Sequence, residues 1–208
     1  MSAAILATSV VAWAAVHSWL ASTGMKQRVG GLLGERMARG YRLVYNAFSF
    51  VSFLPILVLM RVLPEHALYS IPAPWIFVLL AGQLGAVLCL VLALLQTDSL
   101  HFVGLRQLTA QSRPSALTTR GFYALVRHPL YLFGLIFLWL TPIMSVNMLT
   151  VYIALSIYLF VGANFEERRL LSEFGAQYEA YRQRTPMIIP RLWSGRPAGT
   201  AAPRHTDR

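Results

Sequence analysis

The chain has 208 residues, of which 56% are hydrophobic and only 12% are charged, and its formal net charge is +10 at pH 7. A water-soluble domain carries about 25% charged residues, so this composition argues against a soluble protein and indicates an integral membrane protein. The basic residues lie in the gaps between apolar segments, which argues against a nucleic-acid partner. The single cysteine, Cys89, excludes an internal disulfide and a metal site of several thiolates.

Five apolar segments are each close to the length of about 20 residues that a helix needs to cross a bilayer. They are residues 3–21, 43–63, 75–95, 122–140 and 143–165. The first has no basic residue before it, and its apolar part is too long for a cleavable signal peptide. The sequence therefore predicts an all-α integral membrane protein with five transmembrane helices.

The basic residues fall on one side of this predicted bundle. The first loop, the third loop and the C-terminal tail hold five, four and eight Lys or Arg, whereas the second loop holds one and the fourth none. Cytoplasmic loops retain positive charge. The distribution therefore predicts an N-terminus outside and a C-terminus in the cytoplasm, and we expect a bacterial inner membrane.

The segment 166–184 has a different pattern. Leu170, Phe174, Tyr178 and Tyr181 recur at helical spacing, and the opposite face is charged. We expect a cytoplasmic amphipathic C-terminal helix. It either lies against the ends of the bundle or anchors the chain on the membrane surface.

Proline interrupts the start of the fourth segment. Pro129 has no N–H to donate and disfavours helical geometry at His128. We therefore expect the helix to begin at Pro129 with His128 as its cap. A helix start presents free N–H groups and the positive end of its dipole, which suit an anion.

The fourth and fifth segments are joined by a short turn, so they run antiparallel and bring Arg127 and His128 close to Glu166 and Glu167. This predicts a pocket that opens to the cytosol and carries both signs of charge. Such a pocket suits a zwitterion like S-adenosylmethionine. Taken singly, the basic residues could be an interfacial anchor and the acids a solvated helix start. Together, on facing helix ends, they favour a functional site.

The same region resembles the membrane methyltransferase superfamily, which includes the isoprenylcysteine carboxyl methyltransferases and the phospholipid methyltransferases. The resemblance covers about residues 117–191 and rests on Gly121-Phe122-Tyr123, Arg127-His128-Pro129-Leu130-Tyr131, Glu166-Glu167, Leu170, Phe174-Gly175, Tyr178, Tyr181 and Pro186. A narrower likeness to the methanethiol S-methyltransferase branch and its NnrU-like relatives rests on Phe102-Val103-Gly104-Leu105-Arg106-Gln107, Thr141-Pro142 with Met144, and Pro186-Met187-Ile188-Ile189-Pro190-Arg191.

The resemblance implies a membrane methyltransferase domain at residues 1–192, with the cofactor half at about 100–192. The Gly, Pro, Ala, Thr and Arg composition after Trp193 predicts a disordered tail at 193–208. The resemblance also implies that the cofactor is S-adenosyl-L-methionine. The residues expected to bind this cofactor are Gln107, Leu117, Tyr123, His128, Pro129, Tyr131 and Glu166.

The acceptor is expected to be a thiol or another small lipophilic molecule. In the isoprenylcysteine enzymes an arginine four residues before the first Glu is expected to meet the substrate carboxylate, and here Gly162 stands at that position. The expected catalytic residues are Arg127 and Glu167: Arg127 or His128 would favour the thiolate, and Glu167 would take a proton. His17 is a candidate substrate contact, and an interhelical hydrogen bond is the alternative for it.

The other expected partners are membrane lipids, with no metal and no nucleic acid. Three alternatives to thiol methylation stay open. The first is isoprenylcysteine carboxyl or phospholipid methyl transfer. The second is an NADPH-dependent lipid or sterol reductase, which resembles the chain around its His-Pro-x-Tyr motif but usually carries Asn where Leu130 lies. The third is a non-enzymatic membrane protein; a transporter is disfavoured because the sequence shows one broken helix rather than a pair.

Overall fold

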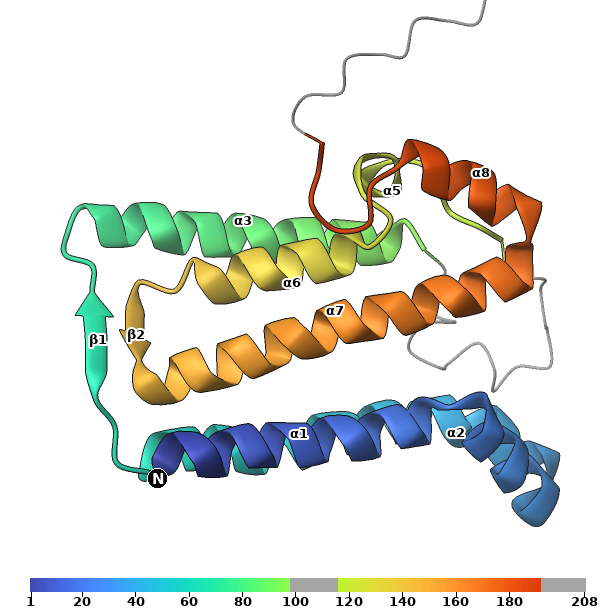
Figure 1. The fold of residues 1–208 in the computed structure, drawn as a ribbon, viewed down its shortest axis with the longest axis horizontal. Coiled ribbons are helices and arrows are strands. Elements are labelled where there is room, and N and C mark those ends of the chain that lie inside the picture. The colour runs from blue at the N-terminus through green and yellow to red at the C-terminus, as the bar shows by residue number, and fades with distance from the viewer. Residues whose placement is uncertain (98–115, 192–208) are drawn as a thin grey trace, which may run out of the picture.

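The computed structural model describes residues 1–97 and 116–191, except for the side chains of residues 35–38. The longer helices run along a common direction (Figure 1). They are α1 (Ser2–Ala21), α2 (Thr23–Val62), α3 (Trp75–Leu95), α6 (Pro129–Trp139) and α7 (Val146–Phe174). α2 is kinked at Gly34, whose φ of 82° and ψ of 170° are not helical, so only its later part follows the common direction (Figure 1). The smaller elements are α5 (Phe122–Leu125), α8 (Ala176–Arg184), β1 (Ala67–Ser70) and β2 (Ile143–Ser145).

Four helical segments are long and apolar enough to cross a membrane: Ser2–Ala21, Arg39–Val62, Trp75–Leu95 and Val146–Phe174. Many of their large apolar side chains are exposed; Phe50 and Leu84, for example, are each 71% exposed. Such surfaces are expected where helices face lipid rather than water. The predicted class, a helical integral membrane protein, is confirmed.

The fourth predicted span, residues 122–140, is not confirmed as one long helix. It is divided into the one-turn helix α5 and helix α6, which has 11 residues. At about 1.5 Å per residue, α6 is roughly 16 Å long, about half the thickness of the hydrocarbon core. The chain is extended at Val126, and α6 begins at Pro129 with His128 as its N-cap. The predicted restart at Pro129 is therefore confirmed.

A two-stranded antiparallel sheet, β1 with β2, closes one end of the bundle, and the prediction of an all-α fold missed it. Beside this sheet, the buried Asn147 side chain donates to the carbonyls of Met60, Leu63 and Pro64 at 3.4, 3.3 and 3.4 Å. These bonds tie the start of α7 to the end of α2. The opposite end of the bundle carries α5 and α8 (Figure 1).

Helix packing divides the bundle into two groups. α1 packs against both α2 and α7, and α3 packs against α6. The buried core of the first group is formed by Leu6, Val10, Ile56 and Val151. Polar side chains connect α6 to α7, including Trp139, whose Nε1 donates to Ser156 Oγ at 3.0 Å. The junction between the two helix groups therefore contains polar side chains, as a binding site for a polar ligand requires.

The predicted single amphipathic helix at residues 166–184 is wrong in its bounds. α7 continues without a break through Phe174, and only α8 is a separate helix. Gly175 separates them with φ 52° and ψ −127°, a conformation that residues with a side chain avoid. Tyr178 and Tyr181 are buried on the inner face of α8, as their spacing predicted.

We expect Gly175→Ala to destabilise the protein. An added Cβ would meet no other atom within 4 Å, so the cost arises from the backbone alone and amounts to about 1–3 kcal/mol. Thermal unfolding in detergent, followed by circular dichroism, measures this as a lower melting temperature. Gly85→Ala in the exposed part of α3 is the control, and it should gain up to about 1 kcal/mol. Equal melting temperatures for the two variants would contradict the assignment.

Candidate functional site

Arg127 and His128 are fixed by the segment that follows α8. The N–H of Arg127 donates to the carbonyl of Pro186 at 2.9 Å, and the N–H of His128 donates to the carbonyl of Met187 at 3.0 Å. Local sequence explains the geometry, because the chain cannot continue as a helix into Pro129 and instead offers its N–H groups to a neighbouring segment. The C-terminal segment thereby becomes part of the site.

Glu167 is the centre of the polar cluster. Its carboxylate accepts two bonds from the Arg127 guanidinium, from Nε at 2.8 Å and from Nη2 at 2.9 Å. It also accepts from His128 Nε2 at 2.8 Å and from the Tyr178 hydroxyl at 2.7 Å. The Arg127 and Glu167 side chains are each only 9% exposed. A two-point pair of this kind, shielded from water and joined by further donors, is both strong and geometrically specific.

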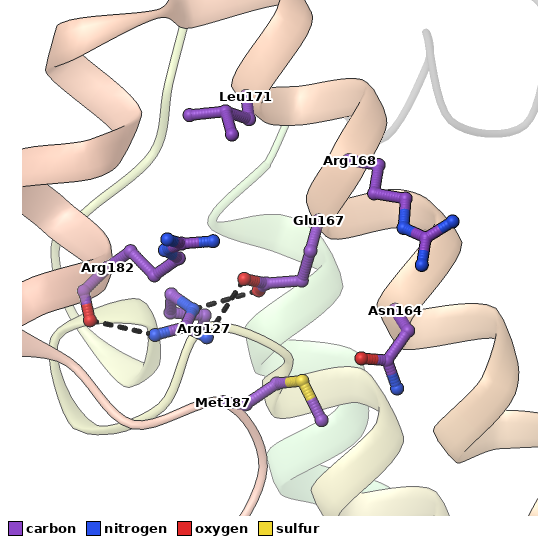
Figure 2. Close-up of a pocket in the computed structure, with 7 residues that line it drawn as sticks. All are labelled: Arg127, Asn164, Glu167, Arg168, Leu171, Arg182 and Met187. Carbon is purple, nitrogen blue, oxygen red and sulfur yellow. Dashed lines mark hydrogen bonds and ion pairs between the residues drawn. The ribbon is translucent and has the colours of Figure 1, made fainter.

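The remaining donors of Arg127 reach the end of α8. Its Nη1 donates to the carbonyls of Arg182 and Thr185, at 2.9 and 2.5 Å. Figure 2 shows the guanidinium between Glu167 and the backbone of Arg182. Burial and the bond to Glu167 raise the pKa of Tyr178, so its hydroxyl remains a donor at neutral pH. Arg127 therefore connects the start of α6, the end of α7 and the end of α8.

Glu166 points to a different set of partners. It accepts from the Tyr131 hydroxyl at 2.9 Å, and it lies 3.6 Å from His128 Nδ1 and 3.6 Å from the exposed Arg169 guanidinium. The Tyr131 ring stacks on the His128 ring at 5.3 Å between centroids. The Glu166 side chain is 33% exposed, so it is more accessible than the Glu167 side chain, which is 9% exposed. The predicted meeting of the basic and acidic residues is confirmed, but His128 lies directly against both carboxylates.

The other predicted cofactor residues lie around this cluster. Burial and the nearby Glu166 carboxylate raise the pKa of Tyr123 to about 12. Pro129 is buried at the first position of α6, and Leu117 is half-buried in the segment before α5. Gln107 lies outside the described residues. Four predicted residues, Tyr123, His128, Tyr131 and Glu166, are thus neighbours in space.

The helix start at Pro129 is less open to an anion than the sequence indicated. The N–H of His128 is used by the carbonyl of Met187, and the N–H of Tyr131 returns to the carbonyl of His128 at 3.1 Å. An anion at this point would therefore compete with bonds inside the protein.

A hollow of about 380 Å³ lies next to the Arg127–Glu167 pair (Figure 2). Besides this pair it is lined by Asn164, Arg168, Leu171, Arg182 and Met187. The hollow thus borders on the polar cluster from the side of Glu167. It presents basic and amide groups beside two apolar side chains.

His17 belongs to a second cluster, between α1, α2 and α7. Its Nε2 lies 2.6 Å from the Tyr45 hydroxyl, and its ring stacks on Trp13 at 4.7 Å. The Tyr158 ring meets it edge-on at 6.0 Å. The interhelical hydrogen bond that was one of the two expectations for His17 is present, and its contact with a substrate stays a prediction.

Several residues of both clusters were not predicted as site residues. Tyr178 was identified as part of an apolar stripe and of the family resemblance, but nothing in the sequence pairs its hydroxyl with Glu167. Tyr45 and Tyr158 lie within apolar segments, where a tyrosine carries little local signal. The carbonyl of Thr185 could not be found from side-chain patterns, because a backbone acceptor leaves no trace in the sequence.

Comparisons with known proteins bear on the polar cluster. The chain is 40% identical over 104 residues to methanethiol S-methyltransferase 2 of Bradyrhizobium diazoefficiens, which covers 48% of this chain and 40% of that protein. It is 36% identical over 129 residues to methanethiol S-methyltransferase of Crocosphaera subtropica, with 56% and 50% covered. It is also 38% identical over 97 residues to methanethiol S-methyltransferase of Mycobacterium tuberculosis, with 43% and 40% covered.

The chain is similar to methanethiol S-methyltransferases. The resemblance predicted from the sequence is thereby confirmed. The matched part spans 40%, 50% and 40% of the length of these three relatives. No family model and no solved structure matches the chain. Within residues 1–97 and 116–191, no group of three or more His, Cys, Asp or Glu is placed to hold a metal ion, and the expected lack of a metal stays a prediction.

We expect Glu167→Gln to weaken the attachment of α8. The substitution leaves the buried Arg127 guanidinium without its counter-charge, and breaking a buried pair in this way costs about 3–5 kcal/mol. Hydrogen exchange of residues 176–187 should accelerate and the melting temperature should fall.

The control for this experiment is Glu179→Gln, which removes an exposed pair with Arg182 at 3.1 Å. Exposed pairs contribute about 0–1 kcal/mol, so exchange in α8 should hardly change. Unaltered exchange in Glu167→Gln would show that the pair does not hold α8.

Proposed function

We propose that the protein transfers a methyl group from S-adenosylmethionine to a small thiol. The observation that carries this proposal is the group formed by Glu166, His128, Tyr131 and Tyr123 at the start of α6. It lies within the region that resembles membrane methyltransferases, and the names of the relatives support the same reaction class.

The residues present fit such a cofactor. Glu166 has an exposed face beside its bond to Tyr131, and a carboxylate of this kind suits an ammonium or ribose hydroxyls. The phenol rings of Tyr123 and Tyr131 offer apolar faces to an adenine. In our proposal His128 and Pro129 complete this wall, and Leu117 and Gln107 remain expected cofactor contacts.

When bound, S-adenosylmethionine supplies an electrophilic methyl group. The protein contributes mainly position, because holding two reactants in line in a dry pocket removes much of the barrier. The short helix α6 supports this arrangement, since its start lies within reach of α7 side chains rather than at the end of the bundle. A small thiol needs little further activation, because only its thiolate must be populated.

Arg127 and Glu167 are proposed as the residues that hold the site in shape. The sequence predicted that Arg127 favours the thiolate and that Glu167 takes its proton. Their mutual bonds, and the bonds of Glu167 to His128 and Tyr178, occupy the groups that this chemistry would need. The geometry therefore favours a positioning role for both residues in the methyl transfer.

A thiol acceptor agrees with Gly162. This residue lies on α7 between Tyr158 and Glu166, and a Cβ added to it would meet no other atom within 4 Å. The position thus has room and no positive charge, so it favours a neutral acceptor over a carboxylate. His17, on the neighbouring α1, is proposed to contact the acceptor.

Orientation in the membrane is the second part of the proposal. The ends of α1, α3 and α7 lie together with α5 and α8 at one end of the bundle, and the N-terminus lies at the other (Figure 1). The predicted basic loops follow these ends. We propose that this end faces the cytoplasm of a bacterial inner membrane, with α6 completing a fifth pass and with membrane lipids around the bundle.

The proposed function is tested with purified protein, labelled S-adenosylmethionine, and three acceptors: methanethiol, an isoprenylated cysteine and a phospholipid. We expect methylation of the thiol alone. We also expect Glu166→Gln to weaken binding of S-adenosylhomocysteine about 10- to 100-fold, the value of one or two bonds to a charged group.

Glu173→Gln is the matched control, because Glu173 is an exposed carboxylate two turns further along α7, and its affinity should equal that of the unmodified protein. Saturable binding of NADPH without binding of S-adenosylhomocysteine would overturn the proposal in favour of a reductase. If only the prenylated cysteine or only the phospholipid is methylated, the protein is still a methyltransferase, but the proposed thiol acceptor is wrong.

The orientation is tested by cysteine labelling of intact cells after Cys89→Ser. Glu65→Cys, before β1, should react with a membrane-impermeant maleimide, whereas Glu179→Cys, on α8, should react only after the cells are opened. Glu65 is exposed and the Glu179 side chain is 36% exposed, and the reaction of Glu179→Cys in opened cells shows that burial does not explain a difference. Labelling of Glu179→Cys in intact cells would reverse the proposed orientation.

A further inference from the structure

The cluster around His17 contains an unsatisfied polar atom. One ring nitrogen of His17, Nε2, pairs with Tyr45. The other, Nδ1, is shielded from solvent and has no hydrogen-bond partner in the described part of the chain. A buried polar atom without a partner costs about 1–3 kcal/mol, so its persistence calls for an explanation such as a partner that arrives with a ligand.

The three aromatic side chains around His17 differ in the hydrogen bonds that fix them. Trp13 is fixed by a bond from its Nε1 to Ser52 Oγ at 3.0 Å, and Tyr45 by its 2.6 Å contact with His17. Tyr158 has an exposed and longer contact, 3.3 Å, with the Ser18 hydroxyl. Among these three residues Tyr158 therefore has the longest and most exposed hydrogen bond.

Tyr158 lies on the side of the proposed cofactor site. It precedes Glu166 by eight residues on α7, about 12 Å along the helix axis. It is also close enough to Tyr131 for their phenols to interact electrostatically. Arg42, on α2, is an electrostatic neighbour of both Glu166 and Tyr45. The two clusters are therefore adjacent regions of one polar zone between α1, α2, α6 and α7.

We propose that His17 Nδ1 is the proton acceptor for the thiol, with Tyr45 as the residue that fixes its tautomer; this rests on the proposed methyl transfer. In the neutral ring, Nε2–H donates to the Tyr45 oxygen, so that Nδ1 carries the free lone pair. The sequence predicted His17 as a candidate substrate contact. In this proposal it also accepts the proton, the role that the sequence predicted for Glu167.

The step is balanced as follows. The S–H bond of the acceptor breaks, and its proton forms an N–H bond at His17 Nδ1. The sulfur lone pair forms a new C–S bond to the methyl carbon, and the electron pair of the broken sulfonium C–S bond stays on the departing sulfur. His17 returns its proton to water before the next cycle. The titratable or charged groups that face His17 or its partner are Tyr41, Tyr45 and Arg42 from α2 and Tyr158 from α7.

The decisive experiment compares His17→Gln on two acceptors of different acidity. With an alkanethiol at neutral pH we expect a loss of about 100-fold in kcat/KM, the lower range for a general base. With an aromatic thiol that is already ionised, the loss should stay below about tenfold, because the thiolate needs no base. The loss with the alkanethiol should also shrink as the pH rises. Equal losses with both acceptors would assign His17 a purely structural role.

Two further measurements keep the proposal testable if His17→Gln does not fold. The ¹⁵N NMR spectrum of histidine-labelled protein, without any ligand, should show His17 with its proton on Nε2, and a proton on Nδ1 in the neutral ring would overturn the assignment. Tyr45→Phe should lose this tautomer preference and show a smaller version of the same acceptor-dependent defect.

Tyr41→Phe is the matched control for Tyr45→Phe, because it removes a phenol hydroxyl one turn away that donates to the Leu20 carbonyl at 2.7 Å; it should retain the tautomer and the activity. S-adenosylhomocysteine binding should be unchanged in all three variants. If the unmodified protein methylates no thiol, the proposed function fails, whereas thiol methylation with equal losses on both acceptors removes only the role of His17.

Discussion

The structure of the site depends on one buried ion pair, Arg127 with Glu167. The guanidinium binds the carboxylate through Nε and Nη2, and its Nη1 donates to two backbone carbonyls at the end of α8. A buried pair of this kind contributes little stability relative to apolar packing, but removing one partner is costly. Its value is therefore specific geometry: it fixes where α6 begins relative to α7. The same carboxylate then orients His128 for its contact with Glu166.

The shortness of α6 gives this pair its functional meaning. If α6 had full length, its start would lie at the end of the bundle. Arg127 and His128 would then face water or lipid headgroups instead of the side of α7. Because Pro129 starts the helix late, the chain before it is extended and presents Arg127 and His128 to the side of α7. Ionisable groups inside a membrane bundle are costly and are usually functional. Their partners here leave Glu166 as the accessible acid.

Much of this could be predicted from the sequence, because the causes are local. The apolar lengths indicated four of the helices that are long enough to cross a membrane, although they overestimated the fourth segment, and the effect of Pro129 on His128 indicated the helix restart. The antiparallel turn indicated that the acids meet the basic residues. Long-range pairing left no such signal: β1 and β2 lie far apart in the chain, and the break at Gly175 falls inside an unbroken helical stripe. Sequence reasoning also could not separate Glu166 from Glu167, since adjacent residues on a helix point about 100° apart and only the packed neighbours decide which one stays open.

The carbonyls that receive the Arg127 guanidinium have a consequence for biogenesis. The carbonyl of Thr185 lies 58 positions later in the chain than the arginine that it binds. During synthesis, Arg127, α6 and α7 are therefore made before the stretch around Thr185. Until that stretch emerges, the guanidinium lacks those backbone partners. Assembly of the polar cluster is thus coupled to the late stage of synthesis. A nascent chain that stops before this stretch has its apolar helices but lacks the carbonyl of Thr185 that binds Arg127.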